Sequence, residues 1–310
     1  MNDFTYNSYG RYLKKRFNGR IQKITVDARF TCPNRDGTKS TGGCTYCNNE
    51  SFSTARKVRD LKIKDQIQRG LTYGKCKYKN VVGNMAYFQS YSNTYAPLDY
   101  LKKIYSEALE VEEIMGLAIG TRPDCIDEEK INYFEELAKT KEIVIEYGIE
   151  SIFDKSLTKI NRCHTYQCFL DAIELTKGRG IKICVHIIIG FPWETKEQWI
   201  QTAQELSKLP IDYLKIHQLH IVKNTIMGNE YQKSPFKMLS KNEYISILIE
   251  FLIHLRPTIV IQRLFGSSSK EITLSQHWNQ SVSELNNELI LKMKKTGSYQ
   301  GRLFKTIETQ

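Results

Sequence analysis

Strand-like and helix-like segments alternate along the chain from about residue 81, and this alternation constrains the fold more than any other feature. The strand-like segments are rich in Ile and Val, as strands covered on both faces of a sheet tend to be. One further strand is expected before residue 81, so the expected strands are at residues 21–28, 83–89, 114–120, 142–149, 181–190 and 212–220. Such alternation favours parallel βα units.

The segments between the expected strands have the apolar periodicity of amphipathic helices. Helices are expected at residues 61–73, 98–110, 128–138, 166–177 and 196–206. Six such units predict an α/β fold, an open partial (β/α)6 barrel whose chemistry lies at the carboxyl ends of its strands.

The pattern weakens after about residue 225, where helices are expected at residues 242–255 and 283–294 and a short strand at 258–261. We therefore expect a basic and aromatic N-terminal arm at residues 1–20, the partial barrel at 21–225, and an α-rich C-terminal extension packed on the barrel at 226–310.

Composition is that of an ordinary globular protein, with 41% hydrophobic and 25% charged residues. Neither a transmembrane run nor a secretory signal is seen, so the expected location is the cytoplasm, with no membrane partner. There, the 8 cysteines are expected to be thiols or metal ligands rather than disulfides.

The net charge of +11 is concentrated at one end of the chain. Residues 1–80 contain 18 Lys and Arg against 6 Asp and Glu, whereas the other 230 residues contain 27 against 28. Localised positive charge favours a polyanionic partner such as nucleic acid, although it also occurs on proteins that bind small anions or as a solvated surface.

Three cysteines lie in a glycine-rich stretch after the first expected strand: Cys32, Cys44 and Cys47. No fourth cysteine or histidine lies near them in the sequence, whereas structural zinc is closed by four protein ligands. A [4Fe–4S] cluster held by three cysteines has one iron free to bind another molecule. We expect such a cluster; zinc with a distant ligand and three unrelated thiols are the alternatives.

The chain resembles the radical S-adenosylmethionine (SAM) superfamily, in particular the bacterial YhcC/YtqA-type group, which is related to the catalytic subunit of Elongator. The resemblance is carried by Cys-Pro-Asn-Arg-Asp-Gly-Thr at 32–38, Gly-Gly-Cys-Thr-Tyr-Cys at 42–47, Tyr-Phe-Gln-Ser-Tyr-Ser-Asn-Thr-Tyr-Ala at 87–96, Gly-Thr-Arg-Pro-Asp-Cys at 120–125, Ile-Asn-Arg at 160–162 and Lys-Ile-His at 215–217. The eleven-residue gap after Cys32 departs from most radical SAM enzymes but is usual in this group. Glu150 stands where relatives often have Gln.

The resemblance implies a [4Fe–4S] cluster on Cys32, Cys44 and Cys47, with SAM bound to the free iron. Reduction of SAM would yield a 5′-deoxyadenosyl radical that takes a hydrogen atom from the substrate. An electron donor such as flavodoxin or ferredoxin is implied as a partner.

The resemblance also implies roles for residues around SAM. Tyr46 and Gly190 would contact adenine, and Gln89 and Ser90 would meet the methionine amine. The remaining implied contacts are the methionine carboxylate for Arg162, the ribose for Glu150 and an unspecified part of SAM for His186. The ordinary alternatives are a packing tyrosine, surface charges and a buried structural histidine.

Four residues near the rim are candidates for substrate contact, with plain packing or surface roles as the alternative: Arg122, Asp124, His217 and His220. The basic and aromatic arm, Tyr6 to Arg20, and the basic stretch that includes Arg56, Lys57 and Arg59 could hold single-stranded RNA. Equally, the aromatics could anchor the arm on the barrel.

The first hypothesis for function is therefore a radical SAM enzyme that modifies tRNA, at the C5 side chain of a wobble uridine. The second is a radical SAM enzyme with a small-molecule or protein substrate. The third is a metal-stabilised RNA-binding module without enzymatic activity. Iron or zinc content and release of 5′-deoxyadenosine discriminate among them.

Overall fold

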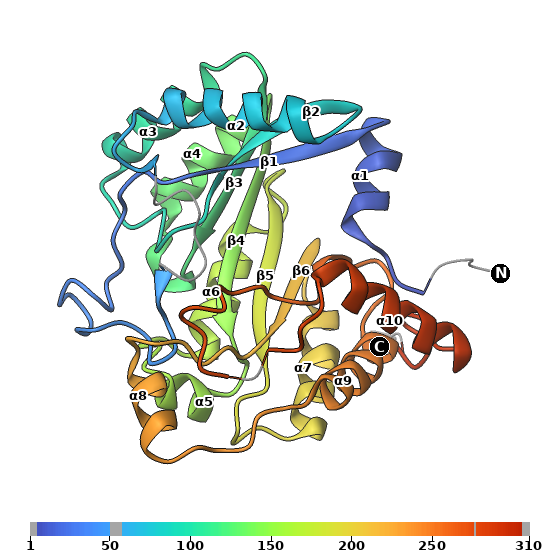
Figure 1. The fold of residues 1–310 in the computed structure, drawn as a ribbon. Coiled ribbons are helices and arrows are strands. Elements are labelled where there is room, and N and C mark those ends of the chain that lie inside the picture. The colour runs from blue at the N-terminus through green and yellow to red at the C-terminus, as the bar shows by residue number, and fades with distance from the viewer. Residues whose placement is uncertain (1–4, 50–57, 276, 306–310) are drawn as a thin grey trace, which may run out of the picture.

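Seven parallel strands form one curled sheet whose order follows the sequence (Figure 1). The computed structural model describes residues 5–49, 58–275 and 277–305. The strands are β1 (Arg20–Val26), β2 (Val81–Phe88), β3 (Ile114–Thr121), β4 (Glu142–Glu150), β5 (Lys182–Ile189), β6 (Tyr213–Gln218) and β7 (Val260–Arg263). Because all are parallel, their carboxyl ends lie at one edge of the sheet.

The predicted α/β class and partial parallel barrel are confirmed, with one addition. The short strand expected at residues 258–261 in the C-terminal extension is β7, which pairs with β6 and continues the sheet. The partial barrel therefore has seven strands rather than six.

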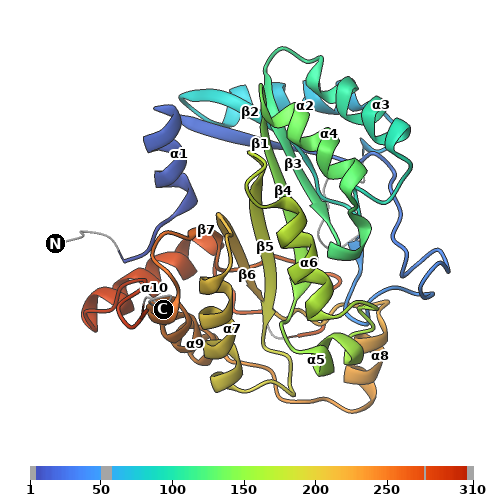
Figure 2. The ribbon, with the colours of Figure 1, turned by 180° about the vertical axis from the view of Figure 1, so that it is seen from behind.

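Helices cover the convex face of the sheet, as the view from behind shows (Figure 2). Ile119, Ile145 and Leu214 on this face are fully buried. The covering helices are α2 (Ile63–Lys77), α3 (Leu98–Leu109), α4 (Glu128–Ala138), α6 (Tyr166–Thr176) and α7 (Lys196–Lys208). All five were predicted to within a few residues.

The concave face is closed at one end by helix α1 (Tyr9–Phe17). Leu13 is buried against this face, and the rings of Tyr9 and Tyr12 pack on Tyr213 at centroid distances of 5.3 and 5.7 Å. These aromatics therefore anchor the arm on the barrel, the second of the two interpretations. The basic residues Arg56 and Lys57 lie outside the described residues.

The chain after β6 forms α8 (Ile226–Lys233), α9 (Lys241–His254) and α10 (Val282–Lys295), with β7 between the last two. Helix α9 packs on α7, and α10 packs on α9. Capping boxes fix the starts of α7, α9 and α10. None of the helices in the described part of the chain is sufficiently long and apolar to cross a membrane.

Candidate active site

The loop after β1 brings the thiols of Cys32, Cys44 and Cys47 to one cavity of about 190 Å³ at the carboxyl edge of the sheet. The loop reverses through Gly42 and Gly43, whose φ angles of 80° and 87° lie in the left-handed region. Residues with a β-carbon rarely adopt that region, which explains the glycine pair immediately before Cys44.

A tight turn after helix α5 (Asp154–Lys159) holds this loop in place. Asn34 Nδ2 donates to Asn161 O at 2.6 Å, and Asn161 Nδ2 donates to Gly43 O at 3.0 Å. Asn161 and Cys163 both have positive φ, so the turn directs the intervening Arg162 back toward the cavity. Two segments far apart in the sequence thus form one site.

Nitrogen donors approach the sulfur atoms closely. Asn34 Nδ2 lies 3.6 Å and Arg162 Nη1 3.5 Å from Cys44 Sγ, and Asn49 Nδ2 lies 3.7 Å from Cys47 Sγ. Burial, followed by the nearby Cys44, raises the pKa of Cys47 to about 12. A metal centre bound here would displace the thiol protons of the cysteines, and the surrounding N–H groups would stabilise the resulting thiolates.

The donor set fits an iron–sulfur cluster. Three thiols line one cavity, and N–H donors lie within 3.7 Å of the sulfurs of Cys44 and Cys47. A [4Fe–4S] cluster held by three thiolates keeps one iron for another ligand, and hydrogen bonds to the sulfurs tune such a cluster.

Arg162 presents an unused donor to the same cavity. Its Nη2 donates to Gly148 O and lies 3.7 Å from Glu150 Oε1, but its buried Nε has no hydrogen-bond partner among the described residues. Buried donors are usually satisfied, so a carboxylate of a bound molecule fits this position. Arg162 therefore fits the role that the resemblance implies.

Glu150 reaches the cavity because β4 is irregular at its carboxyl end. The pairing of β4 with β5 shifts between Gly148 and Glu150, and Glu150 has a φ of 68°. A residue with a β-carbon adopts this region uncommonly. Burial raises the pKa of Glu150, an effect that Arg162 opposes. Tyr46 also lines the cavity, and its ring centroid lies 6.3 Å from that of Phe191.

A buried charge cluster forms the floor of the cavity. Glu146 has no exposed side-chain surface; it accepts hydrogen bonds from Lys23 at 2.6 Å and from Lys215, and lies 3.0 Å from His186. Although burial opposes ionisation, Lys215 and Lys23 hold the pKa of Glu146 well below its usual value. Of these four residues, the sequence analysis named only His186. The other three could have been noticed as charged residues within otherwise apolar strands.

The structure places the other predicted residues in three ways. Gln89, Arg122 and His217 line the cavity, whereas Ser90 is buried but not among its lining residues. Asp124 is held by Arg122 and Lys39; burial opposes its ionisation, but these partners lower its pKa to about 2. Two predicted residues line a different, neighbouring cavity: Gly190 and His220.

Acidification is expected to destabilise the fold through its partly buried imidazoles. Burial lowers the pKa of His186 to about 4 and that of His217 to about 3. Between pH 6.5 and 4 the unfolded chain therefore binds protons that the folded chain does not, so the free energy of unfolding falls as the pH falls. Urea unfolding at several pH values near 5 gives the change of the free energy of unfolding with pH. This change should be smaller by about 1.4 kcal/mol per pH unit for His217→Gln than for the wild type. Equal slopes would contradict this assignment.

Comparison with known proteins gives the family. Residues 36–206 match the Radical SAM superfamily, and residues 211–295 match the Radical_SAM C-terminal domain. This chain belongs to the radical SAM superfamily. Its members are enzymes that use SAM with a [4Fe–4S] cluster, and the predicted cofactors are thereby confirmed.

The relatives agree with the group suggested by the motifs. YtqA of Bacillus subtilis is 29% identical over 98% of this radical SAM chain and 94% of its own. YhcC of Escherichia coli K12 is 32% identical over 88% of this chain and 87% of its own. A shorter match, 27% identical over 47% of this chain, is with the tRNA uridine(34) acetyltransferase of Methanocaldococcus infernus, of which it covers 28%.

Among solved structures, the archaeal Methanocaldococcus infernus Elp3 with an N-terminal deletion has a TM-score of 0.71 at 16% identity. The likeness covers 90% of this radical SAM chain and 64% of that chain, and it shows a shared fold.

Proposed function

We propose that this radical SAM enzyme modifies tRNA, at the C5 side chain of the wobble uridine. The observation that carries the radical chemistry is the convergence of three thiols and the unused donor of Arg162 on one cavity. The tRNA substrate is supported by the concentration of positive charge in residues 1–80 and by the partial match to a tRNA uridine(34) acetyltransferase.

In this proposal each part of the cavity has a task. Cys32, Cys44 and Cys47 hold the cluster, and Arg162 binds the methionine carboxylate of SAM through a charge-assisted hydrogen bond. Glu150 accepts from the ribose hydroxyls, and Tyr46 packs on adenine. When bound and reduced by a flavodoxin or ferredoxin, such a cluster with SAM would supply a 5′-deoxyadenosyl radical for hydrogen abstraction from the substrate.

The floor of the cavity then faces the substrate. Lys215, His186 and His217 line it from adjacent strands, with Glu146 fixing the first two. Hydrogen bonds to Glu146 or to the backbone hold these side chains, so they position a base without reorganisation. The target uridine would have to leave its stack to reach them.

Nucleosides of cellular tRNA test the proposed substrate. Cells that lack the protein are expected to lose one C5-substituted uridine from position 34 and to accumulate its precursor, as measured by mass spectrometry. The wild-type gene should restore the nucleoside, whereas a Cys44→Ala variant should not. An unchanged nucleoside profile would refute the tRNA substrate and favour a small-molecule or protein substrate.

Replacement of Arg162 by glutamine is expected to weaken SAM binding by roughly 10- to 100-fold, because a charged hydrogen bond contributes about 1.5–3 kcal/mol. Equilibrium dialysis of the reconstituted protein measures this. Iron content separates SAM binding from cluster loss. The matched control is Arg179→Gln, since Arg179 pairs with Glu128 and Glu135 on helix α4, outside the cavity. Equal SAM affinity of both variants would contradict the role of Arg162.

A further inference from the structure

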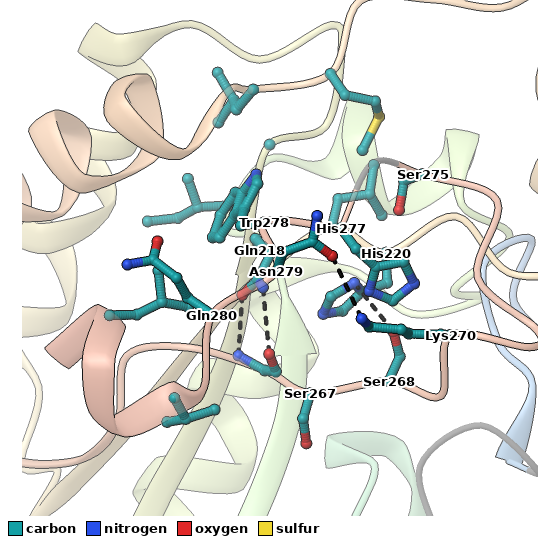
Figure 3. A pocket seen from close by; sticks show the side chains of 18 of the residues that line it. Gln218, His220, Ser267, Ser268, Lys270, Ser275, His277, Trp278, Asn279 and Gln280 are labelled. Atoms are coloured by element: carbon teal, nitrogen blue, oxygen red, sulfur yellow. Dashed lines mark hydrogen bonds between the residues drawn. The ribbon is translucent and has the colours of Figure 1, made fainter.

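The structure has a second cavity, of about 400 Å³, which Figure 3 shows from close by. It is bounded by the carboxyl ends of β5 and β6, by α10 and by the segment that joins β7 to α10. Gly266 separates it from the first cavity: a β-carbon there would lie 2.9 Å from Cβ of His217 and 3.3 Å from Nε2 of His220. His217 lines the first cavity and His220 the second, so the two cavities are neighbours.

The wall of this cavity is polar without being acidic. No Asp or Glu occurs among the described residues that line it, and Lys270 is the one cation among them. Hydroxyl, amide and imidazole groups supply the other polar atoms, as the labelled side chains in Figure 3 show. A cationic ligand has no counter-charge in such a site, whereas a neutral ring carrying a phosphate does.

The indole of Trp278 lines the same cavity and is supported from one side by Tyr244, with a ring-centroid distance of 5.4 Å. Tyr244 itself is fully buried and donates to Leu264 O at 2.8 Å. A supported aromatic ring offers a stacking surface for a planar ligand at little entropic cost.

Two imidazoles in this wall have buried Nε2 atoms. That of His277 has no hydrogen-bond partner among the described residues, and that of His220 lies beside the backbone of Gly266. His220 Nδ1, in contrast, lies 3.3 Å from Ser268 Oγ. Unsatisfied buried nitrogens are costly, so their pairing with the polar edge of a ligand is favoured. Burial lowers the pKa of His220 to about 4, so its imidazole is neutral near pH 7 and suited to a base edge.

We infer that this second cavity binds one nucleotide of the RNA substrate that flanks the target uridine, and this inference rests on the proposed tRNA substrate. Single-stranded RNA is recognised by stacking of bases on aromatic rings and by hydrogen bonds to their edges. Trp278 supplies the ring, His220 and His277 read the edge, and Lys270, exposed at the rim, contacts the phosphate. Occupation of both cavities would fix which nucleotide of the RNA loop enters the active site.

Binding of a fluorescently labelled tRNA anticodon stem-loop to the reconstituted full-length protein tests the inference. A base stacked in a protein contributes about 1–3 kcal/mol. An abasic nucleotide at one position flanking the target uridine should therefore weaken wild-type binding roughly 10-fold. His277→Ala should also weaken binding of the intact RNA, and the abasic nucleotide should then cost less than it costs in the wild type, because the base has already lost one of its contacts.

Further variants show whether a loss of RNA binding is specific to the second cavity. His254→Ala removes a histidine at the far end of α9 that does not line the cavity, and it should bind like the wild type. Asn279→Gly keeps the positive φ of this position but removes the amide oxygen that accepts from Lys270 Nζ at 3.4 Å. Lys270 is then no longer held at this wall, so binding should also weaken. Lys270→Ala should weaken intact and abasic RNA equally, as a phosphate contact does. Thermal unfolding and iron content verify that each variant is folded.

The outcomes separate the inference from the function on which it rests. If the wild type binds no tRNA stem-loop, both the proposed substrate and the second cavity's role are wrong. If the wild type binds but His277→Ala and Asn279→Gly bind equally well, the inference alone is overturned. Additive losses from His277→Ala and the abasic nucleotide would overturn it as well, because they would place that base elsewhere.

Discussion

Replacing Cys44 with alanine is expected to abolish iron loading at the three-cysteine loop and, with it, the reductive release of 5′-deoxyadenosine from SAM. Cys44 Sγ is the sulfur that both Asn34 and Arg162 approach, and two thiols cannot hold a cluster that needs three. Anaerobic reconstitution with iron and sulfide, followed by dithionite and SAM, measures both quantities. Iron should fall from about four atoms per chain to background.

Cys76→Ala is the matched control, because Cys76 is an exposed thiol on α2 and does not line the cavity. It should retain both iron and SAM cleavage. Loss of iron in both variants would indicate non-specific binding of iron to thiols. Retention of a full cluster in Cys44→Ala would refute the three-cysteine assignment.

Replacing Glu146 with glutamine is expected to lower the free energy of unfolding by about 3–5 kcal/mol, the usual cost of removing one partner from a buried ion cluster. The variant leaves the ammonium groups of Lys23 and Lys215 in the barrel interior without a carboxylate. Glutamine preserves the side-chain volume, so the effect reports charge rather than a cavity. Urea unfolding at pH 7 measures it.

Glu136→Gln serves as the control for this second experiment. Glu136 pairs with Lys139 on the surface of α4, where both side chains are more than half exposed, so its loss should cost less than about 1 kcal/mol. If Glu146→Gln were no more destabilising than Glu136→Gln, the cluster would not contribute to stability. In that case its lysines would have to be sufficiently solvated without a counter-ion.

The parallel sheet was predictable because its strands are covered on both faces and therefore appear as Ile- and Val-rich runs, such as residues 181–190. The three cysteines were predictable because cluster ligands within a loop are close in the sequence. The strand β7 was predicted as an element, but its place in the sheet was not, because local pattern does not specify which strands pair.

The buried charge cluster and the second cavity were not predictable for a different reason. Glu146, Lys215 and Lys23 belong to three separate strands, and only the curvature of the sheet brings them together. His220 lies beyond the end of β6 at Gln218, where the alternation of faces no longer determines the direction of a side chain. It therefore lies in the neighbouring cavity rather than with His217.

Helix α1 packs on the concave face through Leu13, Tyr9 and Tyr12 and closes the amino end of the barrel. The cavity lined by the three thiols lies at the opposite, carboxyl edge of the sheet. A tRNA bound over this edge, as proposed above, would cover the SAM site. SAM is then expected to bind before the tRNA, and the products of SAM to leave after it.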